Sequence, residues 1–96
     1  MSVRSWLGTV LAVDRFGNLI TNFAVREFSG LLTGKFEAKV GRARVCRCAR
    51  SYDEGERRGL FFIEGSSGYL EIASRMNSAA QRAGCAAGAK VQLTID

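Results

Sequence analysis

The chain has 96 residues, of which 47% are hydrophobic and 24% are charged, and its formal net charge is +5. Its length predicts one domain, residues 1–96, that buries roughly 60–65% of its unfolded surface, and its apolar content excludes a disordered chain. No apolar run approaches the roughly 20 residues of a membrane-spanning helix, and the first residues (MSVRSW) lack the apolar core of a secretory signal, so we expect a cytoplasmic protein without membrane partners.

The first predicted elements are two strands joined by a tight turn. Residues 3–13 are expected to form a strand with apolar residues on both faces, which indicates burial between layers or in a barrel wall. The chain then reverses over residues 15–18, where Gly17 supplies the positive φ that a tight turn needs. Residues 19–23 return as the second strand of this hairpin.

A short helical turn and a second hairpin follow. Residues 24–28 have the apolar spacing of a single helical turn, and residues 31–34 are expected to form a loop. Residues 35–40 and 42–50 are expected to be strands on either side of Gly41. Both strands carry positive charge.

The second half of the chain begins with its most polar segment, residues 51–59 (SYDEGERRG), which we expect to be a surface loop. Residues 60–63 (LFFI) are wholly apolar and predict a strand at the centre of the core. A second tight turn over residues 65–68 is followed by a strand over residues 69–73.

The last predicted elements are a helix and a closing strand. Asn77 is a candidate N-cap for a helix over residues 78–83, Gly84 lies just past its end, and residues 90–95 form the closing strand. About seven short strands with one brief helix, and no alternation of strands and helices, predict an all-β fold. We expect a small Greek-key β-barrel of about seven strands, with a sandwich as the alternative.

A basic stretch without any acidic residue covers the second hairpin and consists of Lys39, Arg42, Arg44, Arg47 and Arg50. On a strand, Arg42, Arg44 and Arg50 would share one face, an arrangement that suits a phosphate backbone. A basic β-barrel nucleic-acid-binding module is therefore one alternative function. We favour a solvated edge strand instead, because no neighbouring aromatic residues offer a stacking surface for bases.

Three cysteines, Cys46, Cys48 and Cys85, are the only thiols, and the chain has no histidine. A closed zinc site has four ligands, so zinc would require an added carboxylate or a partner chain. The odd number of cysteines argues against a disulfide framework. We therefore expect no metal site, and we expect buried or half-buried free thiols.

Two turn motifs carry the functional signal. Residues 14–22 (DRFGNLITN) place a carboxylate, an aromatic ring and a carboxamide at the end of a hairpin, and residues 65–73 (GSSGYLEIA) contain a second turn, which is flanked by glycines. By pattern alone, polar residues in such turns often satisfy only the amides of the turn itself. In this order, and followed by Gly-x-x-Val-x-Leu at residues 88–93, the motifs resemble the C-terminal domain of the S-adenosylmethionine hydroxide adenosyltransferases, which are related to the fluorinating and chlorinating enzymes.

The resemblance implies an adenine-binding site. Phe16 would lie against the adenine face, Asn18 would hydrogen-bond to the purine edge, and Tyr52 would close over the base. The backbone around Ser74 and Met76 would approach the adenine edge. The alternative for Phe16 is that its ring folds back into the core.

For the methionine half of S-adenosylmethionine the resemblance implies Asp14, Ser66 and Ser67. Asp14 would accept a hydrogen bond from the α-ammonium group, and the serines would offer hydroxyl and backbone N–H groups to the α-carboxylate. Ordinary turn residues are the alternative for the two serines. Glu71 is interpreted as a strand-face or loop-capping charge.

Departures from the halogenating relatives point to the hydrolytic branch. Those enzymes carry a tryptophan where this chain has Ile20, an arginine where it has Ser67, and a proline that is absent between Arg15 and Phe16. The implied reaction converts S-adenosylmethionine and water to adenosine and methionine, with S-adenosylmethionine as the substrate and no cofactor.

The implied catalytic residues are not in this chain. In the family an aspartate, an arginine and a histidine of a larger N-terminal domain activate water, and neighbouring subunits of a trimer share the site. Because this chain lacks histidine, we expect a substrate-binding half-site with no catalytic residue and no turnover of its own. We expect it to form a homo-oligomer and to work with an N-terminal catalytic domain, in the same or a separate chain. A structural oligomerisation domain without nucleoside affinity is the remaining alternative.

Overall fold

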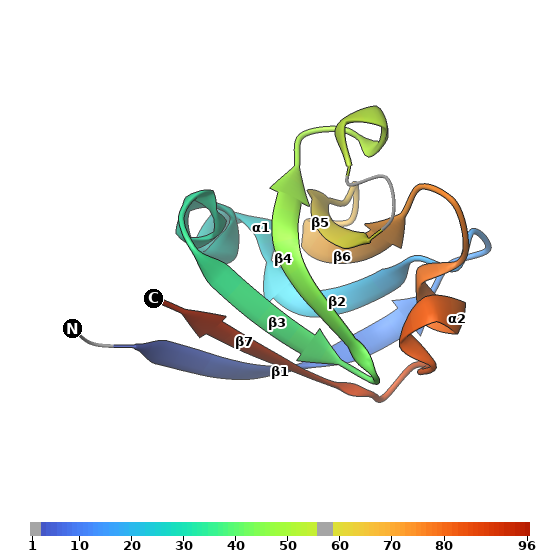
Figure 1. Cartoon of the computed structure of the whole chain (residues 1–96), viewed down its shortest axis with the longest axis horizontal. Helices are drawn as coiled ribbons and strands as arrows, with labels where there is room; N and C mark the ends of the chain where they lie inside the picture. The colour runs from blue at the N-terminus through green and yellow to red at the C-terminus, as the bar shows by residue number, and fades with distance from the viewer. Residues whose placement is uncertain (1–2, 56–58) are drawn as a thin grey trace.

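The computed structural model describes residues 3–55 and 59–96, which form a closed barrel with the strand order β1–β2–β6–β5–β4–β3–β7 (Figure 1). The strands are β1 (Arg4–Val13), β2 (Leu19–Ala24), β3 (Phe36–Val40), β4 (Ala43–Ala49), β5 (Leu60–Glu64), β6 (Tyr69–Ser74) and β7 (Lys90–Ile95). Neighbouring strands are antiparallel except β4 and β5, which are parallel. The predicted all-β barrel is confirmed.

Short helical segments join the strands: α1 (Val25–Phe28), the 3-10 segments η1 (Ser29–Thr33) and η2 (Tyr52–Glu54), and α2 (Ala79–Ala83). Helix α1 confirms the predicted helical turn, whereas the loop expected at residues 31–34 is mostly part of η1. In the polar segment 51–59, residues 51–54 are exposed as predicted, and residues 56–58 lie outside the described residues. In the described part of the chain, no helix is long and apolar enough to cross a membrane.

Helix α2 begins one residue later than predicted. Its N-cap is Ser78, whose Oγ accepts a hydrogen bond from the Gln81 N–H (3.2 Å), and not Asn77. The Asn77 N–H donates instead to Ser74 Oγ (3.4 Å), which places Asn77 in the loop before the helix. At the other end Gly84 adopts the left-handed conformation typical of a helix terminus, as predicted.

The barrel interior is filled by inward-facing apolar side chains from every strand. Fully buried examples are Leu19, Phe62, Leu70, Ile72 and Leu93, and each such side chain contributes roughly 1.5–3 kcal/mol to folding. In the predicted core strand, Phe62 packs in this interior. Phe61 belongs to a separate small cluster with Ala49 and Ala73, because successive side chains of a strand point to opposite faces.

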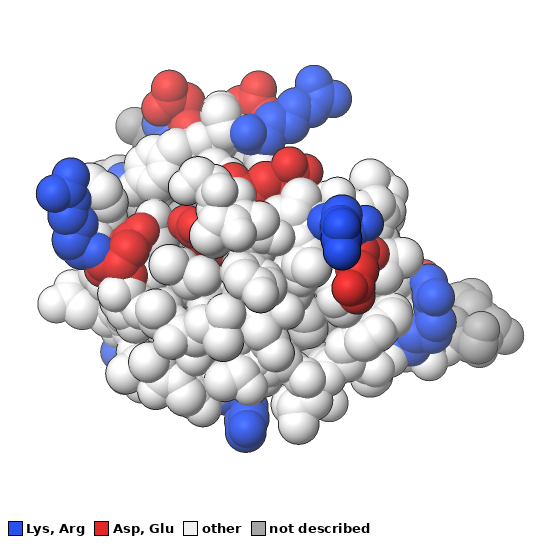
Figure 2. All heavy atoms as spheres, turned by 180° about the vertical axis from the view of Figure 1, so that it is seen from behind, with Lys and Arg blue, Asp and Glu red and all other residues white. Residues whose placement is uncertain are grey.

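Strand β1 lies in the barrel wall, as expected, but only one of its faces is buried. Gly8 and Val10 are buried, whereas Leu7 and Leu11 are 70% and 49% exposed. Burial of both faces was therefore a wrong prediction, because no second layer covers the outward side of β1 within the described residues. Figure 2 shows the molecule from behind, so that β2 lies nearer to the viewer than β4. The middle and lower parts of this surface carry few charged side chains.

Candidate functional site

The turn between β1 and β2 is held by the carboxylate of Asp14. Its Oδ1 accepts hydrogen bonds from the backbone N–H groups of Phe16 and Asn18 (both 2.9 Å), and its Oδ2 accepts one from Asn18 Nδ2 (3.2 Å). The Asp14 N–H donates to the Asn18 carbonyl (3.0 Å), and the Gly17 N–H donates to the Asp14 carbonyl (3.0 Å). Asp14 therefore fixes both the turn and the orientation of the Asn18 amide.

Helix α2 packs against the same turn. The Ala80 N–H donates to the Gly17 carbonyl (2.9 Å), which satisfies one of the N–H groups left free at a helix N-terminus. The φ angle of Gly17 is 84°, and a Cβ added there would lie 2.1 Å from Ser78 Oγ. Both the backbone conformation and the close approach of α2 thus require glycine at this position.

Phe16, Asn18 and Tyr52 line one surface pocket of about 320 Å³. The Phe16 ring is 68% exposed, and the guanidinium carbon of Arg15 lies 5.0 Å from the ring centroid. The alternative that Phe16 folds back into the core is therefore wrong. Three of the five residues predicted to bind adenine meet at this pocket, although Tyr52 comes from η2, a distant part of the sequence.

Tyr52 is fixed by the backbone at the end of β6. Its hydroxyl donates to the carbonyl of Ser74, and its ring packs edge-on against Phe61 with 6.0 Å between the centroids. Ser74 is fully buried, and Met76, two residues later, is 65% exposed. The loop from Ser74 to α2 thus connects Tyr52 on one side to the Asp14–Asn18 turn on the other, so the predicted adenine set gathers at one end of β6.

Ser66 and Ser67 lie at the opposite end of β6, in the turn that follows β5. The strand between them and Ser74 spans roughly 17 Å. The turn is closed by the backbone: the Gly68 N–H donates to the Gly65 carbonyl (3.2 Å). Both serines are exposed, and neither side chain hydrogen-bonds to a residue that the structure describes. The predicted methionine-binding residues are thus divided between the two ends of β6, with Asp14 at the pocket end.

Glu71 lies on β6 between the two turns. Its Cα partners are Ile20 of β2 and Ile63 of β5. Its carboxylate lies against Gly65, where an added Cβ would be 2.2 Å from Oε2. Burial, and secondly the negative charge of Asp14, raise the pKa of Glu71. The sequence analysis interpreted Glu71 as a strand-face or loop-capping charge and not as a ligand, because its place between the two turns depends on the pairing of β2 with β6.

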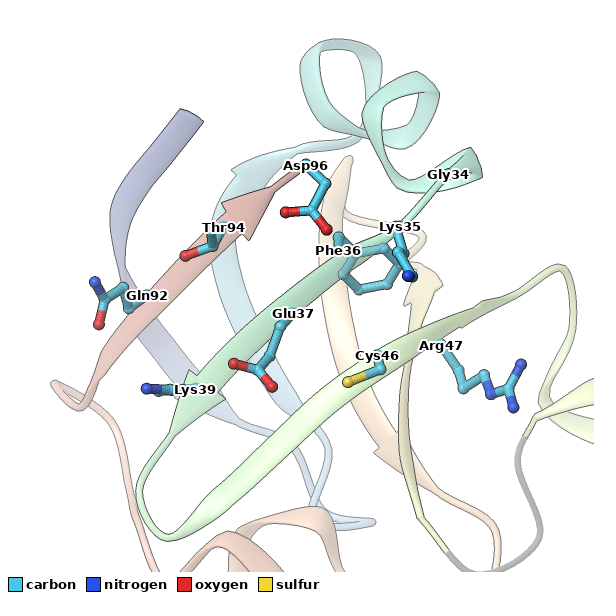
Figure 3. Close-up of a pocket in the computed structure, with 10 residues that line it drawn as sticks. All are labelled: Gly34, Lys35, Phe36, Glu37, Lys39, Cys46, Arg47, Gln92, Thr94 and Asp96. Carbon is cyan, nitrogen blue, oxygen red and sulfur yellow. The ribbon is translucent and has the colours of Figure 1, made fainter. Parts of the chain in front are cut away.

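A larger pocket, of about 620 Å³, lies on the outer surface of β3, β4 and β7 (Figure 3). Its charged lining mixes the cations of Lys35, Lys39 and Arg47 with the carboxylates of Glu37 and Asp96. Such a mixture gives no continuous positive surface for a phosphate backbone.

Two arginines of the basic stretch are engaged within the domain. Arg42 Nε and Nη2 donate to the carbonyls of Arg82 (3.3 Å) and Gln81 (3.1 Å) at the end of α2. Arg44 Nη1 lies 3.6 Å from Glu37 Oε2. Arg42 also precedes the start of β4 and so does not continue a row along that strand. These contacts do not favour the nucleic-acid alternative.

The three cysteines lie apart from the pocket lined by Phe16. Cys46 and Cys48 are exposed on β4, which corrects the expectation of buried or half-buried thiols there, and Cys85 is half-buried. Although Cys48 is exposed as a residue, partial burial of its thiol, and secondly the charge of Glu64, raise its pKa; partial burial also raises the pKa of Cys85. Across residues 3–55 and 59–96, no three His, Cys, Asp or Glu side chains are grouped to hold a metal ion.

Comparison with known proteins identifies a matching family. The model of the S-adenosylmethionine hydroxide adenosyltransferase C-terminal domain matches residues 8–92. Among solved structures, an uncharacterised conserved protein from Thermotoga maritima is 26% identical with a TM-score of 0.78, over 93% of this chain and 35% of its own. A conserved hypothetical protein from Thermus thermophilus is 33% identical with a TM-score of 0.69, over 91% of this chain and 34% of its own. The chain thus spans about a third of each of these proteins. No curated protein was found to match the sequence.

Proposed function

The chain belongs to the family of S-adenosylmethionine hydroxide adenosyltransferase C-terminal domains, and on this premise we propose that it binds the adenosyl group of S-adenosylmethionine. The observation that carries the proposal is the pocket of about 320 Å³ at which Phe16, Asn18 and Tyr52 meet. A volume of this size lies at the lower end of the range for small-molecule sites. All three are residues that the family resemblance implies for adenine binding.

The chemistry of the pocket suits a purine. The exposed Phe16 ring offers a face for stacking, which contributes roughly 0.5–1.5 kcal/mol beyond the buried area. The bond from Asn18 Nδ2 to Asp14 Oδ2 orients the amide, and no described donor bonds to Asn18 Oδ1. This oxygen would accept a hydrogen bond from the exocyclic amino group of adenine, while the second Nδ2 hydrogen would face a ring nitrogen.

The methionine half is proposed to run along the outer surface of β6, from the pocket past Glu71 to Ser66 and Ser67. Asp14 was the predicted acceptor for the α-ammonium group, but its oxygens already accept three hydrogen bonds within their own turn. Glu71 makes no hydrogen bond to a described residue, so it retains its full capacity to accept from a cation. Exposed hydroxyl and N–H groups at the far turn suit the α-carboxylate.

Hydrolysis of S-adenosylmethionine to adenosine and methionine is the proposed reaction of the complete site, to which this chain contributes substrate binding. Among the residues that the structure describes, those that line the pocket are Phe16, Asn18 and Tyr52, and they offer no imidazole, amine or carboxylate to activate water. The catalytic groups are proposed to come from a further domain, in the same or a neighbouring chain. The functional unit is accordingly proposed to be an oligomer.

Isothermal titration with adenosine and with S-adenosylmethionine tests this proposal. Asn18→Ala should weaken the binding of both ligands by roughly 1–3 kcal/mol, the cost of leaving a polar edge unpaired. The matched control is Gln92→Ala, which removes an exposed carboxamide at the larger pocket and should leave the affinity unchanged. Binding should also be nearly independent of salt, unlike that of a nucleic acid. No heat from the wild-type chain at millimolar ligand, or equal affinity of the Asn18 variant, would contradict the proposal.

A further inference from the structure

Glu71 is a half-buried carboxylate on the outward side of the barrel wall. Its neighbours along β6, Leu70 and Ile72, are fully buried in the interior, so Glu71 points the other way. Its Cα partners on the adjacent strands are Ile20 and Ile63, which are half-buried as well. The chain has 14 Lys and Arg residues, yet no residue that the structure describes forms an ion pair or a hydrogen bond with this carboxylate.

A carboxylate in such surroundings lacks the positive group that would stabilise its charge. Removing a charge from water is unfavourable unless the charge is paired. Burial, and secondly the negative charge of Asp14, accordingly raise the pKa of Glu71. A cation placed beside the carboxylate would offset both effects, because an opposite charge favours the ionised form. The surroundings of Glu71 therefore favour a positively charged group of a ligand.

The turn over residues 65–68, here called the serine turn, makes room for the carboxylate. A Cβ added at Gly65 would overlap it, lying 2.7 Å from Cδ of Glu71. The Gly65 N–H donates to the Tyr69 carbonyl (3.0 Å), so Gly65 lies beside the residue two positions before Glu71. The side chain of Glu71 therefore extends along β6 toward the serine turn and away from the proposed adenosine pocket.

We infer that Glu71 receives the α-ammonium group of an S-adenosyl amino acid and makes the domain select ligands that carry this group. The inference rests on the proposed function, because it takes the adenosine pocket as given. In such a ligand the α-ammonium and the α-carboxylate are bonded to the same carbon. The acceptor of the ammonium must therefore lie next to the groups that hold the carboxylate, which are proposed to be those of the serine turn. Glu71 meets this condition, whereas Asp14 lies at the pocket end and its oxygens already accept three hydrogen bonds.

The charge on the ligand's sulfur is not what Glu71 recognises in this arrangement. The sulfur is bonded to C5′ of the ribose and so lies on the adenosine side of the amino-acid chain, from which the Glu71 side chain points away. An ammonium group also offers three N–H donors to a carboxylate, and a sulfonium offers none. The ligand class is therefore S-adenosyl α-amino acids, with S-adenosylmethionine and the thioether S-adenosylhomocysteine bound alike.

A double-mutant cycle between protein and ligand tests the inference. S-adenosylhomocysteine, and its analogue in which hydrogen replaces the α-amino group, are titrated calorimetrically into the wild-type chain and into Glu71→Gln. The variant keeps the size of the side chain beside Gly65 and removes its charge. Glu64→Gln is the matched control, because Glu64 is an exposed carboxylate next to the same turn but pairs with the inward-facing Leu70. Adenosine and S-adenosylmethionine complete the ligand set.

Glu71→Gln should weaken the binding of S-adenosylhomocysteine and S-adenosylmethionine by roughly tenfold or more, the effect of losing a charged hydrogen bond. The affinities for adenosine and for the analogue without the amino group should stay unchanged, and Glu64→Gln should behave as wild type. An unchanged affinity for S-adenosylhomocysteine would overturn the inference. So would a loss confined to S-adenosylmethionine, which would assign Glu71 to the sulfonium, or an equal loss for adenosine, which would indicate a structural role.

The two proposals fail in different ways. If the wild-type chain binds adenosine but Glu71→Gln changes the affinity for no ligand, the inference is overturned and the proposed function stands. If the wild-type chain binds none of the four ligands, the proposed function is contradicted and the inference falls with it.

Discussion

The two glycine-containing turns of this barrel that carry the predicted site residues are fixed to different degrees by the chain itself. The turn from Asp14 to Asn18 is closed by side-chain and backbone hydrogen bonds and rests on the N-terminus of α2. The turn from Gly65 to Gly68 is closed by backbone bonds alone, and its serines are exposed.

The first turn is therefore ordered before a ligand binds, whereas the serine side chains of the second turn become ordered only when a ligand binds. At the first turn, the conformational entropy of the pocket residues is already lost when the protein folds. At the second turn, the serine side chains lose their freedom only on contact with a ligand. We therefore expect substitutions in the first turn to change stability and binding together, and substitutions of the two serines in the second turn to change binding alone.

The largest expected effect is that of Gly17→Ala. The new side chain would be strained at a φ of 84° and would meet the backbone as well as the side chain of Ser78, with Cα at 2.9 Å. Left-handed strain and overpacking together should lower the free energy of unfolding by about 2–4 kcal/mol. Chemical denaturation measures this loss. Gly68→Ala is the control, since its φ is 92° but no atom lies within 4 Å, and it should lose only about 1–2 kcal/mol.

The next effect is that of Asp14→Ala, which removes three hydrogen bonds and leaves two backbone N–H groups of the turn unpaired. The free energy of unfolding should fall by about 1–3 kcal/mol, and adenosine affinity should fall with it because Asn18 loses its orientation. Thermal unfolding of this variant measures the loss of stability, and titration of the same variant with adenosine measures the loss of affinity. A variant of wild-type stability would show that the turn does not depend on this carboxylate.

The third expected effect is that of Glu71→Gln on the pH dependence of stability. The raised pKa means that the folded state favours the protonated carboxyl, so ionisation of Glu71 destabilises the fold as the pH rises above the ordinary value of 4.5. The stability of the Gln variant relative to wild type should therefore increase with pH over that range. Urea denaturation at several pH values measures it, with Glu27→Gln on the exposed side of α1 as the control. A difference that stays constant or falls with rising pH would contradict the assignment.

The smallest effect on stability is expected for the double variant Ser66→Ala with Ser67→Ala. Both hydroxyls are exposed and make no hydrogen bond to a described residue, so the free energy of unfolding should change by no more than about 0.5 kcal/mol. The affinity for S-adenosylmethionine should nevertheless fall, while the affinity for adenosine stays the same. An equal fall for both ligands would mean that the serines do not distinguish the methionine half.

Local signals predicted most of the fold. The hairpins formed around Gly17, Gly41 and Gly68 because each of these glycines adopts a positive φ that few other residues tolerate. The start of α2 was placed one residue early, because Asn77 and Ser78 are both favoured cap residues. Their tertiary contacts decided between them: Ser78 packs on Gly17, and the Asn77 N–H bonds to Ser74.

The site could be predicted only in part, since it depends on strand register. The sequence placed Phe16 and Asn18 at one turn, but only the pairing of β2 with β6 brings Glu71 between the two turns and sets Ser66 and Ser67 at the far end. Likewise, an apolar strand does not reveal which of its faces is covered. The exposure of Leu7 and Leu11 on β1 was therefore outside the reach of the sequence pattern.

The central claim, that the Asp14–Asn18 turn and Tyr52 form a preformed adenosine site, is tested most directly by mapping amide chemical shifts during titration with adenosine. We expect concentration-dependent shifts concentrated at Phe16, Gly17, Asn18 and Tyr52, with Lys39 and Gln92 at the larger pocket unmoved. Shifts confined to the surface of β3, β4 and β7, or none at millimolar adenosine, would contradict the claim.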